Sequence, residues 1–68
     1  MEKTPHEKTL FIIEELQLSA RQVAEAIEKS TSVVSKKKKR ESYNQFLQED
    51  FEKLKRFFLL KLEKIRNL

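Results

Sequence analysis

The sequence predicts a small all-α protein, a bundle of about four helices with a long C-terminal helix. The chain has no glycine and a single proline near its start, and it is rich in Leu, Glu, Lys and Gln. Apolar side chains also recur at steps of three and four residues in several segments. With 68 residues we expect one domain, near the size at which one apolar core barely suffices and a second copy often supplies further burial.

The first helix is expected to begin at Pro5 and to run to about Gln17. Thr4 has the chemistry of an N-cap, proline is favoured at the first helical position, and Glu7 lies in the first turn. Its buried stripe is predicted to comprise Leu10, Ile13 and either Leu16 or Leu18, with Phe11 and Ile12 at its sides. This stripe is expected to pack on the helix that follows.

Residues 19–40 predict two short helices joined by a turn. Ser19 followed by Gln22 has the form of a capping box, so a helix should open at Ala20 and bury Val23, Ala24 and Ile27. Hydroxyl side chains at 30–32 favour a second helix start near Thr31. In that helix Val34 is expected to face inward, with Val33 beside it, while Thr31, Ser32, Ser35 and Lys36 point outward.

The residues Gln22-Val23-Ala24, with Ile27 three positions after the alanine, and the run Ser-Thr-Ser-Val-Val-Ser at 30–35 are typical of one family. The segment resembles the lambda-repressor-like (Xre-type) helix-turn-helix regulators over about a quarter of the chain. The resemblance implies a helix-turn-helix domain spanning residues 1–68 that binds double-stranded DNA. The helix near Thr31 would then be the recognition helix.

Two features differ from the usual pattern of that family. Glu28 and Lys29 stand at the turn, where the family has glycine followed by an apolar residue. Because glutamate adopts a left-handed conformation less readily than glycine, we expect the turn to be made differently, for example by extension of the first of the two helices. Lys37 stands where the family often buries an apolar side chain.

Positive charge is concentrated directly after the predicted recognition helix. Residues 36–40 read Lys-Lys-Lys-Lys-Arg, and without them the chain of net charge +4 would be slightly acidic. An isolated lysine run is usually a solvated loop, but a cationic cluster beside a recognition helix indicates a polyanionic ligand.

The expected DNA contacts divide into two groups. Hydroxyl and ammonium groups can read base edges in the major groove, and we assign Thr31, Ser32, Ser35 and Lys36 to that role. Phosphate contacts are assigned to Lys37, Lys38, Lys39 and Arg40, with Arg21 and Gln22 holding the backbone from the preceding helix. Tyr43 is expected either to contact a phosphate or to be buried. About four phosphates per subunit would give a slope of log affinity against log salt near −3.6, or about −7 for a dimer.

The C-terminal helix is predicted to span about residues 44–68, with Ser42 or Asn44 as its cap. Glu49 and Asp50 fall early in it and Lys64 and Arg66 late, which suits the helix dipole. Its apolar stripe is predicted to comprise Leu47, Phe51, Leu54, Phe58, Leu62, Ile65 and Leu68. A break near residues 58–60 is left open.

This helix is longer than the core of so small a bundle requires. The run Phe57 to Leu60 is apolar on nearly all sides and would be aggregation-prone if uncovered. We expect a second copy to cover it, through a dimer interface comprising Phe57, Leu59, Leu62, Ile65 and Leu68. The alternative is that the whole stripe is intramolecular core.

Catalysis is not expected. There is no glycine for a phosphate-binding loop and no cysteine for a thiolate site. His6, the only histidine, is expected to be solvated in the first turn, with no metal-binding role.

We therefore expect no cofactor, metal, small-molecule substrate or membrane span, and a cytoplasmic, nucleoid-associated location. Two rival functions are a protein-interaction module whose basic run contacts an acidic partner, and a membrane-surface peptide.

Overall fold

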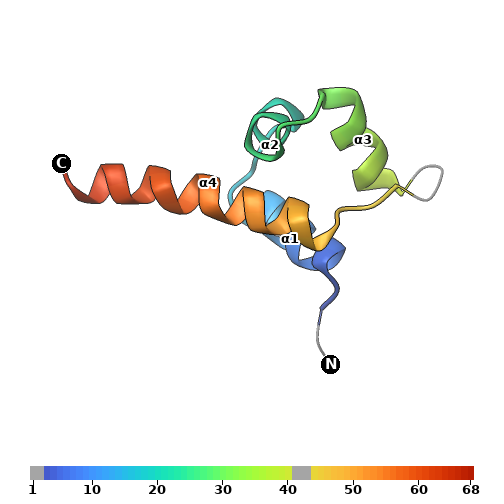
Figure 1. The fold of residues 1–68 in the computed structure, drawn as a ribbon, viewed down its shortest axis with the longest axis horizontal. Helices are drawn as coiled ribbons and strands as arrows, with labels where there is room; N and C mark the ends of the chain where they lie inside the picture. The colour runs from blue at the N-terminus through green and yellow to red at the C-terminus, as the bar shows by residue number, and fades with distance from the viewer. Residues whose placement is uncertain (1–2, 41–43) are drawn as a thin grey trace.

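The computed structural model describes residues 3–40 and 44–68, which form four α-helices and no strand. They are α1 (Pro5–Glu15), α2 (Ala20–Ile27), α3 (Thr31–Lys39) and α4 (Gln48–Arg66). Helices α1 and α2 both pack on α4, and α3 packs on α2 (Figure 1). The predicted all-α fold with a long C-terminal helix is confirmed. The longest dimension is 43 Å, because α4 continues past the other helices.

The predicted starts of the first three helices are confirmed by their side-chain caps. The Glu7 N–H donates to Thr4 Oγ1 at 3.1 Å, and the Val33 N–H donates to Ser30 Oγ at 3.3 Å. At the start of α2 the capping box is complete: the Gln22 N–H donates to Ser19 Oγ, and the Ser19 N–H donates to Gln22 Oε1. These bonds satisfy backbone donors that a helix start otherwise leaves unpaired.

Left-handed residues follow the first three helices, although the chain contains no glycine. They are Gln17 (φ 51°), Glu28 (φ 61°) and Arg40 (φ 57°). The prediction that the turn after α2 would avoid this conformation was wrong, since α2 ends at Ile27 and Glu28 itself is left-handed. The Lys29 N–H then donates to Ala24 O at 3.0 Å, which closes the helix end and offsets part of the strain.

The core lies where α1, α2 and the first half of α4 meet. Most of the predicted inward positions are confirmed, and Leu18, not Leu16, completes the α1 side. The buried apolar residues are Ile13, Leu18, Val23, Ala24, Ala26, Ile27, Val34, Phe46 and Leu54. Phe46 is the largest fully buried side chain, and the sequence pattern did not single it out.

The beginning of α4 differs from the prediction. The helix begins at Gln48 and not near residue 44, and residues 44–47 are not helical. The expected cap Ser42 lies outside the described residues, and the Leu47 N–H donates to Asp50 Oδ2 at 2.9 Å. As a consequence Phe46 points into the core, and Leu47, which was predicted to be buried, is half exposed.

Helix α4 then runs unbroken to Arg66, so the possible break near residues 58–60 is absent. Phe57 and Phe58 are partly buried against the core. Beyond them the apolar side chains leave the bundle: Leu59, Leu62, Ile65 and Leu68 are each more than half exposed. The second half of the stripe is therefore not intramolecular core.

Candidate nucleic-acid interface

Helix α3 is held by one face and presents the other to solvent. Val34 is fully buried and Val33 half-buried, so the aliphatic side chains anchor the helix on α2. The side chains predicted to point outward do so: Thr31, Ser32, Ser35 and Lys36 are all exposed. Positions 31, 35 and 32, 36 are each four residues apart and lie on one side of the helix. The result is a solvent-facing ridge of hydroxyl and ammonium groups.

The basic run does not act as one unit. Lys36, Lys38, Lys39 and Arg40 are exposed, whereas Lys37 is buried. Lys37 lies three and four residues after Val34 and Val33, so helical geometry places it on the anchored face. The assignment of Lys37 to phosphate contacts is therefore corrected: its ammonium group is turned into the protein.

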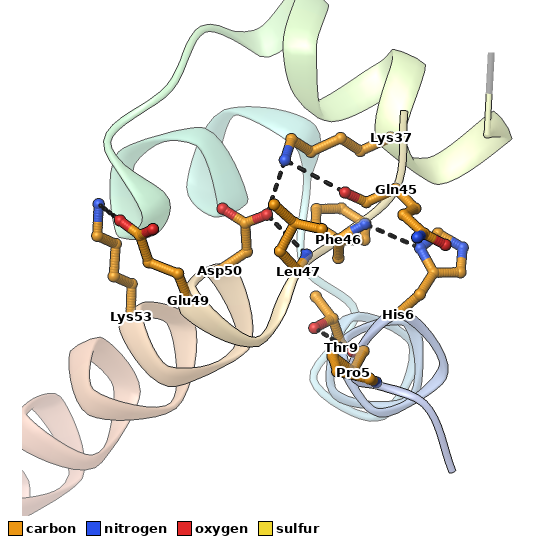
Figure 2. Close-up of polar contacts among 10 residues, drawn as sticks. All are labelled: Pro5, His6, Thr9, Lys37, Gln45, Phe46, Leu47, Glu49, Asp50 and Lys53. Carbon is orange, nitrogen blue, oxygen red and sulfur yellow. Dashed lines mark hydrogen bonds and ion pairs between the residues drawn. The ribbon is translucent and has the colours of Figure 1, made fainter. Parts of the chain in front are cut away.

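Lys37 has two hydrogen-bond partners inside the protein (Figure 2). Its Nζ lies 2.7 Å from Asp50 Oδ2, and it also donates to Gln45 O at 3.2 Å. The same Asp50 oxygen accepts the Leu47 N–H. One carboxylate thus caps α4 and neutralises a lysine of α3, which fixes the end of α3 relative to α4. The signal for this pair in the sequence was Lys37 itself, which stands at a position where an apolar side chain is often buried. A buried ammonium group requires a carboxylate partner.

Next to this pair the structure buries His6, which was expected to be solvated. The side chain is 3% exposed, and its ring stacks on Phe46 at a centroid distance of 5.6 Å. Its Nδ1 accepts the Phe46 N–H at 3.0 Å (Figure 2), so the neutral ring carries its proton on Nε2. Burial lowers the pKa of His6 and the charge of Arg40 lowers it further, while Glu7 opposes both. His6 is thus a structural link between α1 and the segment before α4.

The two predicted contacts at the start of α2 are both exposed. Arg21 projects from the first turn. Gln22 uses its Oε1 atom in the capping box, so only its Nε2 amide group remains to donate to a DNA phosphate. Tyr43, the remaining candidate, lies outside the described residues.

Other kinds of site find no support in residues 3–40 and 44–68. No group of three or more His, Asp or Glu side chains there is placed to hold a metal ion. None of the helices formed by these residues is both long enough and apolar enough to cross a bilayer.

Comparison with known proteins adds nothing to this picture: no protein-family model, no curated protein and no solved structure matches the chain.

Proposed function

We propose that the chain is a lambda-repressor-like helix-turn-helix regulator that binds double-stranded DNA sequence-selectively and has no enzymatic activity. The observation that carries the proposal is the orientation of α3. Val34 and Lys37 hold the helix on the body, and the opposite face exposes Thr31, Ser32, Ser35 and Lys36. A helix presented in this way fits the major groove, which admits an α-helix and displays a distinct pattern for each base pair.

The side chains on this face suit base readout. Hydroxyl groups can donate to or accept from base edges, and the ammonium group of Lys36 favours guanine O6 and N7. The residues near the start of a recognition helix usually reach the bases, and here they are Thr31, Ser32 and Ser35.

Phosphate contacts are assigned to the exposed cations around that face, Lys38, Lys39 and Arg40, with Arg21 and the Gln22 amide group at the start of α2. Since Asp50 neutralises Lys37, the number of phosphates neutralised by the run falls to about three per subunit. The contribution of the run to the slope of log affinity against log salt is then about −2.7 per subunit, or about −5.4 for two copies.

We further propose that the regulator acts as a homodimer in the cytoplasm, associated with the nucleoid. A two-fold pair presents two copies of α3 to half-sites one helical turn apart, roughly 34 Å. The exposed apolar half of α4 supports association with another protein surface.

The test is a fluorescence anisotropy titration of the full chain against random genomic duplex fragments at two salt concentrations, followed by sequencing of the bound pool. We expect salt-dependent binding and enrichment of a repeated half-site. The test variant combines Ser32→Ala with Lys36→Ala on the α3 ridge. The matched control combines Lys53→Ala with Lys64→Ala on α4. Only the first pair should relax selectivity. A salt slope near zero, or a bound pool without enrichment, would contradict sequence-selective DNA binding.

The exposed end of α4 also favours a second candidate, a protein-interaction module whose basic run contacts an acidic partner. It predicts that the wild-type chain binds duplex DNA weakly or not at all. It also predicts that alanine at positions 36 and 38–40 leaves any such binding unchanged.

A further inference from the structure

The second half of α4 projects beyond the bundle (Figure 1), and its apolar side chains are exposed. Leu59, Leu60, Leu62 and Ile65 are each more than half exposed. Helical geometry places Phe58, Leu62 and Ile65 on one stripe, with Leu59 at its edge and Leu60 on the far side. A contiguous apolar surface of this kind marks an interaction site.

The stripe adjoins an apolar hollow on the body of the same molecule. Two neighbouring grooves flank the base of the projecting helix, and Leu16, Phe58 and Leu62 line both of them. One groove also contains Leu18 and Ile65. Leu16, just after α1, is half exposed, although most of the residues that line the grooves with it are apolar. The chain therefore presents both a protruding apolar ridge and, directly beside it, a concave apolar surface.

The second half of α4 and the end of α1 carry charges of opposite sign. The projecting half of α4 carries Lys61, Lys64 and Arg66 against a single Glu63. Glu14 and Glu15, at the end of α1 beside the hollow, are exposed and make no ion pair with the residues that the structure describes. The charged side chains that line the grooves are Lys55 and Lys61, and the carboxylates lie at the end of α1. A basic half of α4 and an acidic end of α1 suit a second copy of the same chain, because each copy then supplies both partners.

We propose that two copies pair through antiparallel second halves of α4, with the ridge of each copy in the hollow of the other. Leu62 lies near the two-fold axis, and Ile65 of one copy reaches Leu16 and Leu59 of the other. Lys61 and Arg66, which flank the stripe, approach Glu14 and Glu15 across the interface. This inference specifies the homodimer of the proposed function and adds the α1 end, Leu16 and its acidic neighbours, to the interface.

The test measures the mass of the full chain in solution by sedimentation equilibrium over the accessible concentration range. We expect a dimer for the wild type. Leu62→Glu or Ile65→Glu should raise the dimer Kd by at least about thirtyfold, because a central interface position is lost in both copies. Leu60→Glu is the matched control: it is equally exposed but lies off the stripe, and it should leave the dimer intact. These positions are exposed, so the circular dichroism spectrum should report folded helices in all three variants.

Charge reversal then identifies the partner surface. Glu15→Lys and Lys61→Glu should each weaken the dimer, and the double variant should recover it, because the pair is then restored with its sign inverted. A wild type that is monomeric throughout, or a Leu60→Glu variant as disrupted as Leu62→Glu, would overturn the interface. Sedimentation of the wild-type monomer with anionic vesicles, or with a different protein in place of a second copy, would also overturn it.

Failure of this interface and failure of DNA binding are separable. Ser32 and Lys36 belong to α3, whereas the stripe belongs to the second half of α4. Ser32→Ala and Lys36→Ala should therefore leave the dimer Kd unchanged. Leu62→Glu should still bind a duplex carrying one half-site with the salt dependence of a single subunit. Loss of cooperative binding to a two-half-site duplex in Leu62→Glu alone is the expected signature of the dimer.

Discussion

The ammonium group of Lys37 lies 2.7 Å from Asp50 Oδ2, and both side chains are shielded from solvent, at 11% and 5% exposure. The contact joins the end of α3 to the first turn of α4 across 13 residues of sequence. Because the same carboxylate accepts the Leu47 N–H, the pair sets both where α4 begins and how α3 is oriented. If all the lysines of the run served one surface role, all of them would be exposed, whereas Lys37 is buried.

This pair predicts that substitutions at the two positions have non-additive effects on stability. Asp50→Asn keeps an acceptor for the Leu47 N–H but leaves a buried ammonium group without its counter-charge, and should lower the free energy of unfolding by about 3 kcal/mol. Lys37→Met in the Asp50→Asn background removes the unpaired charge and should recover much of the loss. Urea denaturation of the two single variants and the double variant measures the coupling. Additive losses would show that the two groups do not interact in solution.

The same geometry predicts that adjacent lysines differ in their effect on DNA binding. Lys38→Ala should reduce the steepness of the salt dependence by about 0.9 per subunit, since one phosphate contact is lost. Lys37→Met, which removes an equal charge one residue away, should leave the slope unchanged because that charge faces Asp50. Anisotropy titrations at several salt concentrations give both slopes. Equal changes in the two variants would place Lys37 on the DNA side.

The turn between α2 and α3 predicts a stabilising substitution. Glu28 is held at φ 61° and ψ 41°, a conformation that is strained for any residue with a Cβ atom. Glu28→Gly should raise the free energy of unfolding by up to about 1 kcal/mol, the relief of strain being partly offset by a more flexible unfolded chain. Glu28→Ala is the control, since it removes the carboxylate but keeps Cβ, and should give no such gain. Denaturant midpoints at neutral pH compare the three chains.

Capping and periodicity predict most of this fold from the sequence, because both are local. Ser19 with Gln22, Ser30 and Thr4 each mark a helix start that the structure confirms. The features that sequence reasoning missed depend on contacts between distant segments. Nothing near His6 in the sequence indicates that Phe46 lies against it 40 residues later. Likewise, the family pattern marks Lys37 as unusual but does not identify Asp50 as its partner.

The segment before α4 provides a direct check on one such miss. Phe46 is fully buried, whereas Leu47, next to it, is half exposed. Phe46→Ala should lower the free energy of unfolding by about 3–5 kcal/mol, the range for a large aromatic lost from a core. Leu47→Ala should lower it by no more than about 1 kcal/mol, because little apolar area is removed from contact. Thermal and urea unfolding measure both. The reverse order would mean that α4 begins earlier, in the register that the apolar periodicity alone predicts.

The buried His6 makes stability depend on pH in a defined direction. Burial, and then the charge of Arg40, hold the pKa of His6 below the 6.5 of an unfolded chain. Between the two values the unfolded state binds more protons, so the contribution to stability is complete above about pH 6.5 and is lost as the pH falls through the folded pKa. Protonation also removes the Nδ1 acceptor of the Phe46 N–H.

The expected result is a wild type that loses stability as the pH falls below about 6.5, beyond the loss caused by its carboxylates. His6→Asn retains a side-chain acceptor for the Phe46 N–H but does not titrate, so it should be less stable than the wild type at neutral pH and show a flatter dependence on pH. The difference between the two curves isolates His6, because every carboxylate is common to both chains. An NMR titration of the His6 ring protons gives the folded pKa independently. Two outcomes would contradict this: a folded-state pKa of His6 at or above 6.5, or parallel stability curves for the two chains. Either would show that His6 is solvated in the first turn of α1, as the sequence alone predicts.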